Sequence, residues 1–191
     1  GLVDEEKLIL RKPQWYREKG INIHLEEPVV EVKPEKKLIR TSRGDTYAYD
    51  RLCLAMGSLS FVPPIKGADV HGVFTLRTLR DAQVIRDYSE KAKKIVIIGG
   101  GVLGLEAGNA LRRLGKVVDV VEFQPRLLPR QMDIPGADIL RREMEAMGFR
   151  FILGASSREI MGKEKVEGVL LESGQTVPCE MVLISAGVRP N

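Results

Sequence analysis

A glycine-rich segment in the second half of the chain has the composition and spacing of a diphosphate-binding loop. The β-branched run at residues 94–98 predicts a buried strand. A Gly-x-Gly-x-x-Gly pattern follows at once, at Gly99, Gly101 and Gly104, and leads into a segment with helical periodicity. A second apolar strand is predicted over residues 117–121 and ends on the acidic Glu122, 23 positions after the first glycine. This order of elements is typical of a dinucleotide-binding unit.

The three glycines of this pattern have separate physical roles. Gly99 permits a tight turn, Gly101 lets the backbone approach a diphosphate, and Gly104 lets the helix pack closely on the strand. The N-terminus of the helix adds backbone N–H groups that have no intrahelical acceptor and therefore attract anions. The residues that we expect to contact the cofactor in this loop are Gly99, Gly100, Gly101, Val102, Leu103 and Gly104.

Glu122 predicts which nucleotide binds. A carboxylate at the end of the second strand accepts hydrogen bonds from the 2′-hydroxyl of an adenosine ribose, and its charge repels a 2′-phosphate. Phe123, the next residue, is not basic. We therefore expect Glu122 and Phe123 to contact NAD(H) rather than NADP(H). Arg126 and Arg130 follow closely in the sequence and leave NADP(H) open as the alternative.

The surrounding patterns predict an α/β fold. The helix after the glycine loop should bury one apolar face, made of Leu103, Ala107, Ala110, Leu111 and Leu114, and should end at Gly115. A further helix is predicted over residues 136–147, and a third strand over 149–153. Short strands with turns at Gly162, Gly168 and Gly174 follow, before a last apolar strand at 181–185. We expect a Rossmann-like dinucleotide-binding domain with a β-meander.

The beginning of the chain repeats the pattern of its end. At a constant offset of 130 positions, Gly44, Thr46, Asp50, Leu52, Leu54 and Gly57 match Gly174, Thr176, Glu180, Val182, Ile184 and Gly187. Residues 19–23 match residues 147–151 at an offset of 128. The counterpart of the glycine loop would fall before residue 1. We therefore expect a partial second copy of the same fold that lacks its opening strand, glycine loop and helix.

These repeats predict two regions. Residues 1–77 should hold the partial copy and a linker, which includes the Pro-containing segment 61–67, and residues 78–191 should hold the complete unit. Thr78, with Asp81 three positions later, is typical of the capping box of a connecting helix that runs through Tyr88.

Composition excludes several other classes of protein. Hydrophobic residues make up 43% and charged residues 29% of the chain, as in ordinary globular proteins. Apolar stretches such as 95–105 are shorter than the roughly 20 residues of a membrane helix, and the net charge of +4 is not gathered into a basic cluster with aromatic residues. We expect no membrane or nucleic-acid partner.

The two cysteines do not have the spacing of a metal site or a redox pair. Cys53 and Cys179 lie 126 positions apart, and Cys53 lies in an apolar run at residues 52–56, so we expect it to be a buried core thiol. The sequence therefore predicts a cytoplasmic protein with no metal site and no disulfide of its own.

Three segments resemble motifs of the pyridine nucleotide–disulfide oxidoreductases, the flavoprotein reductases with two dinucleotide-binding domains. Residues 49–58 are similar to the family's Y-D-x-L-x-x-A-T-G-S, with Met56 in place of Thr. Residues 99–106 are similar to G-G-G-x-x-G-x-E, and residues 186–191 resemble the G-x-R-P-N ending. Within the family, the resemblance is closest to NADH:rubredoxin reductases and to the flavoprotein domain of NADH-dependent nitrite reductases.

The resemblance implies that residues 1–77 are the C-terminal part of an FAD-binding segment and that residues 78–191 are the NAD(H)-binding domain. It further implies that Glu106 and Gly187 lie near the nicotinamide, that Ala55, Met56 and Gly57 abut FAD in the full-length parent, and that Val29 touches its adenine. No side chain of this chain is expected to act as a catalytic acid or base.

The implied function is that of the NADH-binding part of an FAD-dependent oxidoreductase, which passes hydride from NADH to flavin and then electrons to an acceptor. The acceptor stays open, as a small redox protein, a downstream redox domain or a small molecule, because neither cysteine matches the family's redox cysteine. The alternative is a non-catalytic NAD(H)-binding or sensing module. An incomplete sheet in the first region would leave an exposed edge, which allows association into a homo-oligomer.

Overall fold

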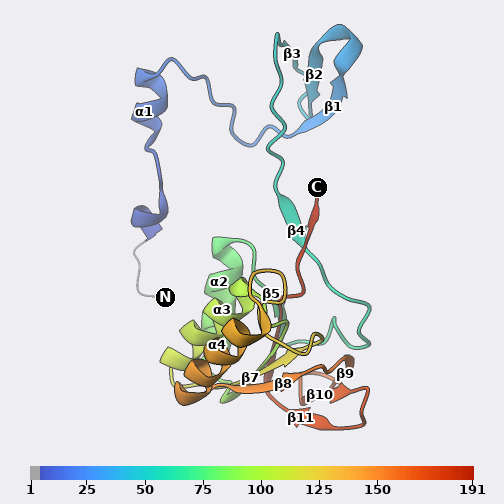
Figure 1. The fold of residues 1–191 in the computed structure, drawn as a ribbon. Helices are drawn as coiled ribbons and strands as arrows, with labels where there is room; N and C mark the ends of the chain where they lie inside the picture. The colour runs from blue at the N-terminus through green and yellow to red at the C-terminus, as the bar shows by residue number, and fades with distance from the viewer. Residues whose placement is uncertain (1–4) are drawn as a thin grey trace. The chain divides into compact units, whose positions relative to one another are not determined.

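A computed structural model describes residues 5–191 of the chain (Figure 1). The chain divides into two compact units, Gly57–Asn191 and a second unit that ends at Met56.

A parallel sheet of five strands forms the centre of the Gly57–Asn191 unit, in the order β5-β12-β6-β7-β8. Its strands are β5 (Val73–Thr75), β12 (Met181–Ile184), β6 (Lys94–Ile98), β7 (Val117–Glu122) and β8 (Arg150–Leu153). The predicted strands at 94–98, 117–121, 149–153 and 181–185 are therefore confirmed, and β5 adds an edge strand that the sequence patterns did not indicate.

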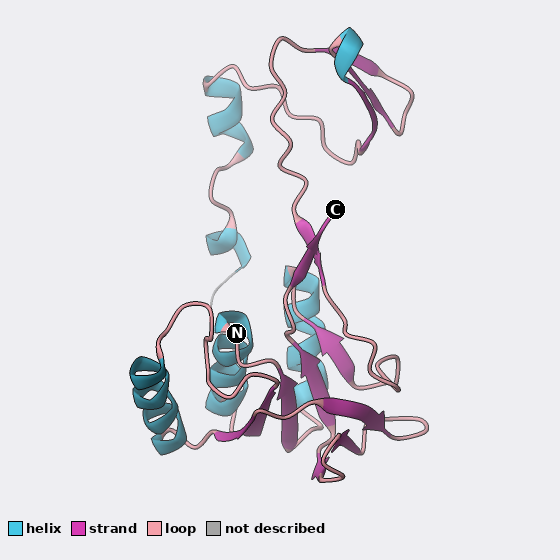
Figure 2. Ribbon diagram, turned by 45° about the vertical axis from the view of Figure 1, so that its right-hand side comes forward, coloured by secondary structure: helices cyan, strands magenta, loops and turns pink. Residues whose placement is uncertain are grey.

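Three helices cover one face of this sheet (Figures 1 and 2). They are α2 (Leu79–Ser89), α3 (Val102–Arg113) and α4 (Ile134–Ala146). Alternate residues of each strand point to opposite faces, so Ile95 and Ile97 pack under the helices. Thr78 and Asp81 form the predicted capping box at the start of α2.

A β-meander covers the other face of the sheet. It consists of β9 (Ser157–Met161), β10 (Gly168–Leu171) and β11 (Thr176–Pro178), antiparallel in the order β11-β10-β9. Val96 and Ile98, the alternate residues of β6, pack with Ile160 and Val169 of the meander. Because both faces of the parallel sheet are covered, its strands are mainly apolar. Asp119, inside β7, is a buried exception and forms an ion pair with Arg150 at the start of β8.

A short antiparallel ribbon completes this unit. It pairs β4 (Ser58–Ser60) with β13 (Val188–Pro190). We predicted a domain boundary between residues 77 and 78, whereas the contacts divide the chain at Gly57. The difference arises because β4 and β5 pair with β13 and β12, strands from the end of the chain.

The other unit, as far as it is described, contains three short helical segments and a second meander. Its elements are η1 (Glu5–Leu8), α1 (Pro13–Glu18), β1 (Val29–Lys33), η2 (Pro34–Lys36), β2 (Leu38–Thr41) and β3 (Thr46–Ala48). The strands are antiparallel in the order β1-β2-β3.

The two meanders repeat each other, which explains the offset found in the sequence. β2 and β3 lie 130 positions before β10 and β11, with the same bounds. The turns also match, because the Gly44 N–H donates to the Thr41 carbonyl and the Gly174 N–H donates to the Leu171 carbonyl, both at 3.0 Å. The expected partial second copy of the fold is therefore present as this meander.

Two expectations about burial are wrong. The sheet-facing side of α3 is made of Gly104, Leu105, Gly108 and Leu111, so Leu111 of the predicted face is confirmed, whereas Ala110 is exposed. Leu103 is 53% and Leu114 49% exposed, because the two glycines bring the helix so close to the sheet that these leucines lie outside the contact. Cys53 is exposed rather than buried, because no strand pairs with residues 52–56 within the described part of the chain.

Candidate functional site

The glycine loop between β6 and α3 has two glycines that the fold itself requires. Gly99 has a φ of +116°, and a Cβ there would lie 2.2 Å from the Ser185 carbonyl oxygen at the end of β12. A Cβ on Gly104 would lie 2.4 Å from the Gly99 carbonyl oxygen. Gly99 therefore makes the turn and Gly104 allows the close approach of helix and strand.

Gly101 differs from these two glycines. It is the N-cap of α3, with a φ of −80° that any residue can adopt, and a Cβ there would meet nothing within 4 Å. Neither backbone strain nor packing of the chain therefore explains a glycine at this position. The open space at Gly101 lies beside the first turn of α3, where backbone N–H groups have no intrahelical acceptor.

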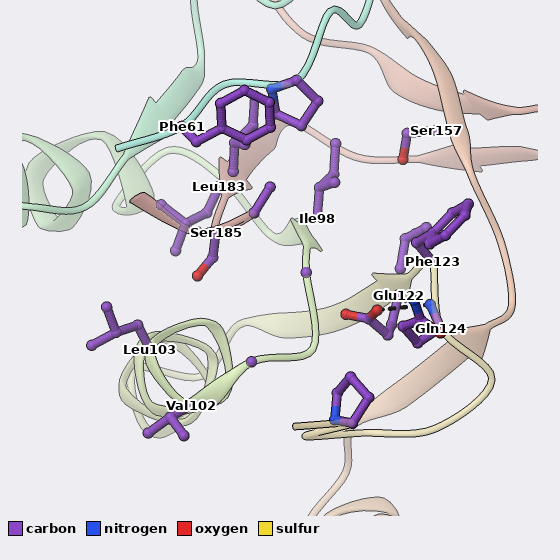
Figure 3. Close-up of a pocket in the computed structure, with 18 of the residues that line it drawn as sticks. Phe61, Ile98, Val102, Leu103, Glu122, Phe123, Gln124, Ser157, Leu183 and Ser185 are labelled. Atoms are coloured by element: carbon purple, nitrogen blue, oxygen red, sulfur yellow. Dashed lines mark hydrogen bonds between the residues drawn. The ribbon is translucent and has the colours of Figure 1, made fainter. Parts of the chain in front are cut away.

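Glu122 lies at the end of β7 and is only 9% exposed. Its carboxylate accepts the Gly100 N–H at 2.5 Å on one oxygen and the Gln124 N–H at 2.7 Å on the other. Figure 3 shows the bond to Gln124. These backbone donors fix the carboxylate, and each oxygen keeps acceptor capacity for a further donor.

A cavity of about 1020 Å³ joins these features at the carboxyl ends of the parallel strands (Figure 3). Of the predicted site residues, it brings together Gly99, Gly101, Val102, Leu103, Glu122, Phe123 and Gly187. Ligands of open α/β sheets bind at this edge. The cavity also has walls that we did not predict, from Phe61 and Ile65 on one side and Ala155, Ser156 and Ser157 on the other.

Arg126 and Arg130, which left NADP(H) as an alternative cofactor, both line the cavity but differ in exposure and in hydrogen bonding. The Arg126 guanidinium donates to the Pro129 carbonyl at 3.0 Å and is partly buried. Arg130 is exposed. Of the two, Arg130 has the accessible guanidinium that a 2′-phosphate would need.

The remaining predicted residues lie outside the cavity lining. Gly100 and Gly104 are covered by neighbouring atoms of the loop and of β7. Glu106 is exposed on α3. We expected Glu106 in the first helical turn, but α3 begins at Val102, so Glu106 lies just beyond that turn and the helix dipole favours it less than we argued.

The residues expected to contact FAD lie elsewhere. Val29, Ala55 and Met56 belong to the unit that ends at Met56, and Gly57 is the residue at which the other unit begins. Val29 is 49% and Met56 59% exposed. Their contact with FAD, and that of Gly57, stays a prediction.

Gly108 is a residue of this site's framework that we missed. A Cβ there would lie 2.7 Å from Ile97 Cδ1 and 2.9 Å from Phe149 Cε1. The available signal was its position four residues after Gly104, which places both glycines on the same side of the helix.

The described part of the chain has one buried cysteine and no metal-binding cluster. Burial raises the pKa of the Cys179 thiol to about 12, which keeps it protonated and unreactive. Among residues 5–191, no group of three His, Cys, Asp or Glu side chains is arranged to bind a metal ion. Within the same residues, no helix has the length and apolarity needed to cross a bilayer.

Known proteins are similar to this chain in sequence and in fold. A family model described as pyridine nucleotide-disulphide oxidoreductase matches residues 4–191. The NAD(P)H nitrite reductase of Bacillus subtilis (strain 168) is 37% identical over 191 residues, which are 100% of this chain and 24% of that protein. The rubredoxin-NAD(+) reductase of Ectopseudomonas oleovorans is 32% identical over 98% of this chain and 49% of its own length.

A solved structure of a related reductase has a similar fold. The ferredoxin reductase from Rhodopseudomonas palustris has a TM-score of 0.92 and 30% identity, over 98% of this chain and 46% of that one. The chain thus spans between about a quarter and a half of the length of these proteins. Because the family model matches nearly every residue, including the three motifs that resemble it, the chain belongs to the pyridine nucleotide-disulphide oxidoreductase family.

Proposed function

We propose that the chain binds NADH in the cavity at the glycine loop and is the NADH-binding part of an FAD-dependent oxidoreductase. The observation that carries this proposal is Gly101. Its backbone is unstrained and its Cβ position is open, so the close approach of a ligand to the backbone accounts for a glycine here beyond the modest preference of N-caps for glycine.

The chain's own residues have the donors and acceptors that an NADH molecule needs. The free N–H groups of Val102 and Leu103, at the start of α3, would donate to the diphosphate. Glu122 would accept the ribose hydroxyls with its remaining lone pairs, and the exposed ring of Phe123 would pack on the adenosine. Gly187, at the β12 side of the same cavity, would lie by the nicotinamide.

The reaction of the complete protein follows from the family. When bound, NADH supplies a hydride to the flavin, and the protein contributes position and electrostatics. The names of the relatives include nitrite, rubredoxin and ferredoxin reductases, so electrons pass to a redox protein or to a small molecule. Neither cysteine of this chain is assigned a part in the reaction, since Cys179 is buried and neither cysteine matches the redox cysteine of the family.

A second candidate is a module that binds NADH and performs no chemistry. It is favoured by the position of the cavity, which lies within one unit and is lined by the glycine loop, Glu122 and Gly187, with no side chain assigned to acid or base chemistry. The two candidates differ in the full-length parent: flavin absorbance that NADH bleaches would identify the enzyme, whereas a colourless parent that binds NADH would identify the module.

The decisive variant is Gly101→Val. Its side chain would fill the space that we assign to the diphosphate, so we expect NADH binding, measured by calorimetric titration, to fall below detection. The midpoint of thermal unfolding should fall only modestly, because no atom of the chain lies within 4 Å of the Cβ position and the main cost is that valine is a poorer N-cap than glycine.

Gly104→Ala is the matched control on the same loop. Its Cβ would lie 2.4 Å from the Gly99 carbonyl oxygen, so this variant should lose stability even without ligand. A folded Gly101→Val protein that binds NADH as tightly as the wild type would refute the proposed site.

A further inference from the structure

We infer that Glu122 is a positioning residue for the glycine loop as well as an acceptor for ribose. It would hold the middle of the loop through the N–H of Gly100. The same side chain would then contribute both to the ribose site and to the conformation of the diphosphate-binding loop. The ligand half of this inference rests on the proposed function, whereas the loop half concerns the chain alone.

The contact between Glu122 and Gly100 joins two elements that are far apart in the sequence. The Gly100 N–H donates to Glu122 at 2.5 Å, and the Gln124 N–H donates to the other carboxylate oxygen at 2.7 Å. Hydrogen bonds to a charged acceptor are about twice as strong as neutral ones. Glu122 is nearly buried, so this bond is shielded from competing water.

The packing around Gly100 fits this role. A Cβ at this position would lie 2.9 Å from Leu127 Cδ2, 3.2 Å from Glu122 Cβ and 3.3 Å from Glu122 Cγ. Leu127 is fully buried. The glycine, which the dinucleotide pattern leaves unspecified at this middle position, is therefore required by the approach of the loop to Glu122.

Both backbone polar groups of Gly100 are hydrogen-bonded within the chain. Its N–H donates to Glu122, and its carbonyl accepts the Leu128 N–H at 3.3 Å. Gly100 thus fastens the loop to β7 and to the segment after it. Donors for a diphosphate must then come from the following residues, at the start of α3.

This arrangement has a consequence for variants of Glu122. Glu122→Gln replaces one carboxylate oxygen by an NH₂ group, which cannot accept a backbone N–H. The variant would release either the Gly100 or the Gln124 donor, and the loop would lose order before any ribose is present. Its loss of NADH affinity should therefore exceed the loss caused by removing the ribose hydroxyls alone.

The first test needs no ligand. Amide hydrogen exchange of the full 191-residue chain, followed by NMR, should show a protected Gly100 N–H in the wild type. In Glu122→Gln its exchange should be at least tenfold faster, whereas Glu143→Gln, an exposed change of the same kind on α4, should leave it unchanged. A Gly100 amide that exchanges at the unprotected rate in the wild type, or at equal rates in wild type and Glu122→Gln, would overturn the inference.

The second test uses an NADH analogue whose adenosine ribose lacks both hydroxyls. If Glu122 acted only on the ribose, wild type and Glu122→Gln would bind this analogue equally, and that result would overturn the inference. We expect Glu122→Gln to bind it at least fivefold more weakly. Failure of the wild type to bind NADH itself would instead refute the proposed function, while the exchange experiment would still decide the role of Glu122 in the loop.

Discussion

At the scale of single residues, the glycines of one motif have different causes. Gly99 and Gly104 are required by atoms of the chain itself, Gly100 by the approach of Glu122 and Leu127, and Gly101 by nothing inside the protein. A search for ligand contacts among glycines should therefore begin with those whose Cβ position is open and whose φ is ordinary.

The state of Glu122 predicts nucleotide selectivity. We expect NADH to bind at least tenfold more tightly than NADPH, a difference of about 1.4 kcal/mol. A 2′-phosphate would meet a nearly buried carboxylate, and Arg126 is engaged with the Pro129 carbonyl. Calorimetric titration with both nucleotides measures the ratio.

Equal affinities, or tighter binding of NADPH, would contradict this prediction. In that case Arg130→Ala, which removes the exposed guanidinium on the cavity wall, should restore the preference for NADH.

At the scale of elements, α3 lies close to the sheet because two of its sheet-facing residues are glycines without side chains. Gly104 and Gly108 place its backbone against the sheet, and Ile97 and Phe149 fill the space that a side chain at 108 would need. The position of the glycine loop, and therefore of the cavity, depends on this close contact.

Gly108→Val should consequently destabilise the protein by about 1–3 kcal/mol or more, because it overpacks a rigid core. Ala110→Val is the matched control, since it adds a β-branched residue on the exposed side of the same helix and should cost under about 1 kcal/mol. Urea unfolding of both variants gives the two free energies. Similar values would show that α3 can shift away from the sheet without loss.

Glu180 links the start of β12 to the start of β6 and should make stability depend on pH. Its carboxylate accepts the N–H of Lys94 at 2.6 Å and that of Lys93 at 2.8 Å. These bonds, chiefly that from Lys94, hold the pKa of Glu180 below its ordinary value. A lowered pKa in the folded state adds stability above the unfolded pKa of about 4.3 and loses it as the pH falls through the folded value.

Glu180→Gln should therefore lower the free energy of unfolding at pH 7 by about 1 kcal/mol or less, because the group is exposed. The difference from wild type should shrink as the pH falls below about 4. Urea unfolding at both pH values checks this, with Glu172→Gln on an exposed turn as the control. A difference that stays the same at low pH would contradict the assignment.

The elements were largely predictable from the sequence, but their contact faces were not. Apolar runs and glycine turns predicted the central strands and α2 to α4, because buried segments require apolar residues and tight turns favour glycine. The sheet-facing side of α3 was missed because leucines outnumber glycines in the helical pattern, and only the close approach to Ile97 shows why Gly108 faces inward. Cys53 was missed because an apolar run predicts burial only where a strand pairs with it.

At the scale of the whole chain, one complete unit is joined to a meander that repeats its end. The repeat was predictable because turns, which demand glycine with positive φ, kept the same spacing at Gly44 and Gly174. The walls of the cavity at Phe61 and Ser157 were not predictable, because they come from segments that reach the glycine loop only through tertiary packing.

The presence of one glycine loop in the 191 residues predicts whether the purified chain binds flavin. The 191 residues contain a single Gly-x-Gly-x-x-Gly pattern, so we expect the purified chain to carry no stoichiometric flavin and to show no NADH oxidation. Absorbance spectra before and after addition of FAD test this. A spectrum of one bound flavin per chain would mean that another part of the molecule binds the flavin diphosphate.

The place of β12 in the sheet also affects how the protein is made. Met181–Ile184 lies between β5 and β6, yet it is the last strand of the sheet to leave the ribosome. Until it emerges, β5 and β6 each lack the neighbouring strand with which they pair in the folded sheet. Folding of the nucleotide-binding unit is therefore delayed until more than a hundred residues of nascent chain have accumulated, an interval in which chaperones would have their main opportunity to act.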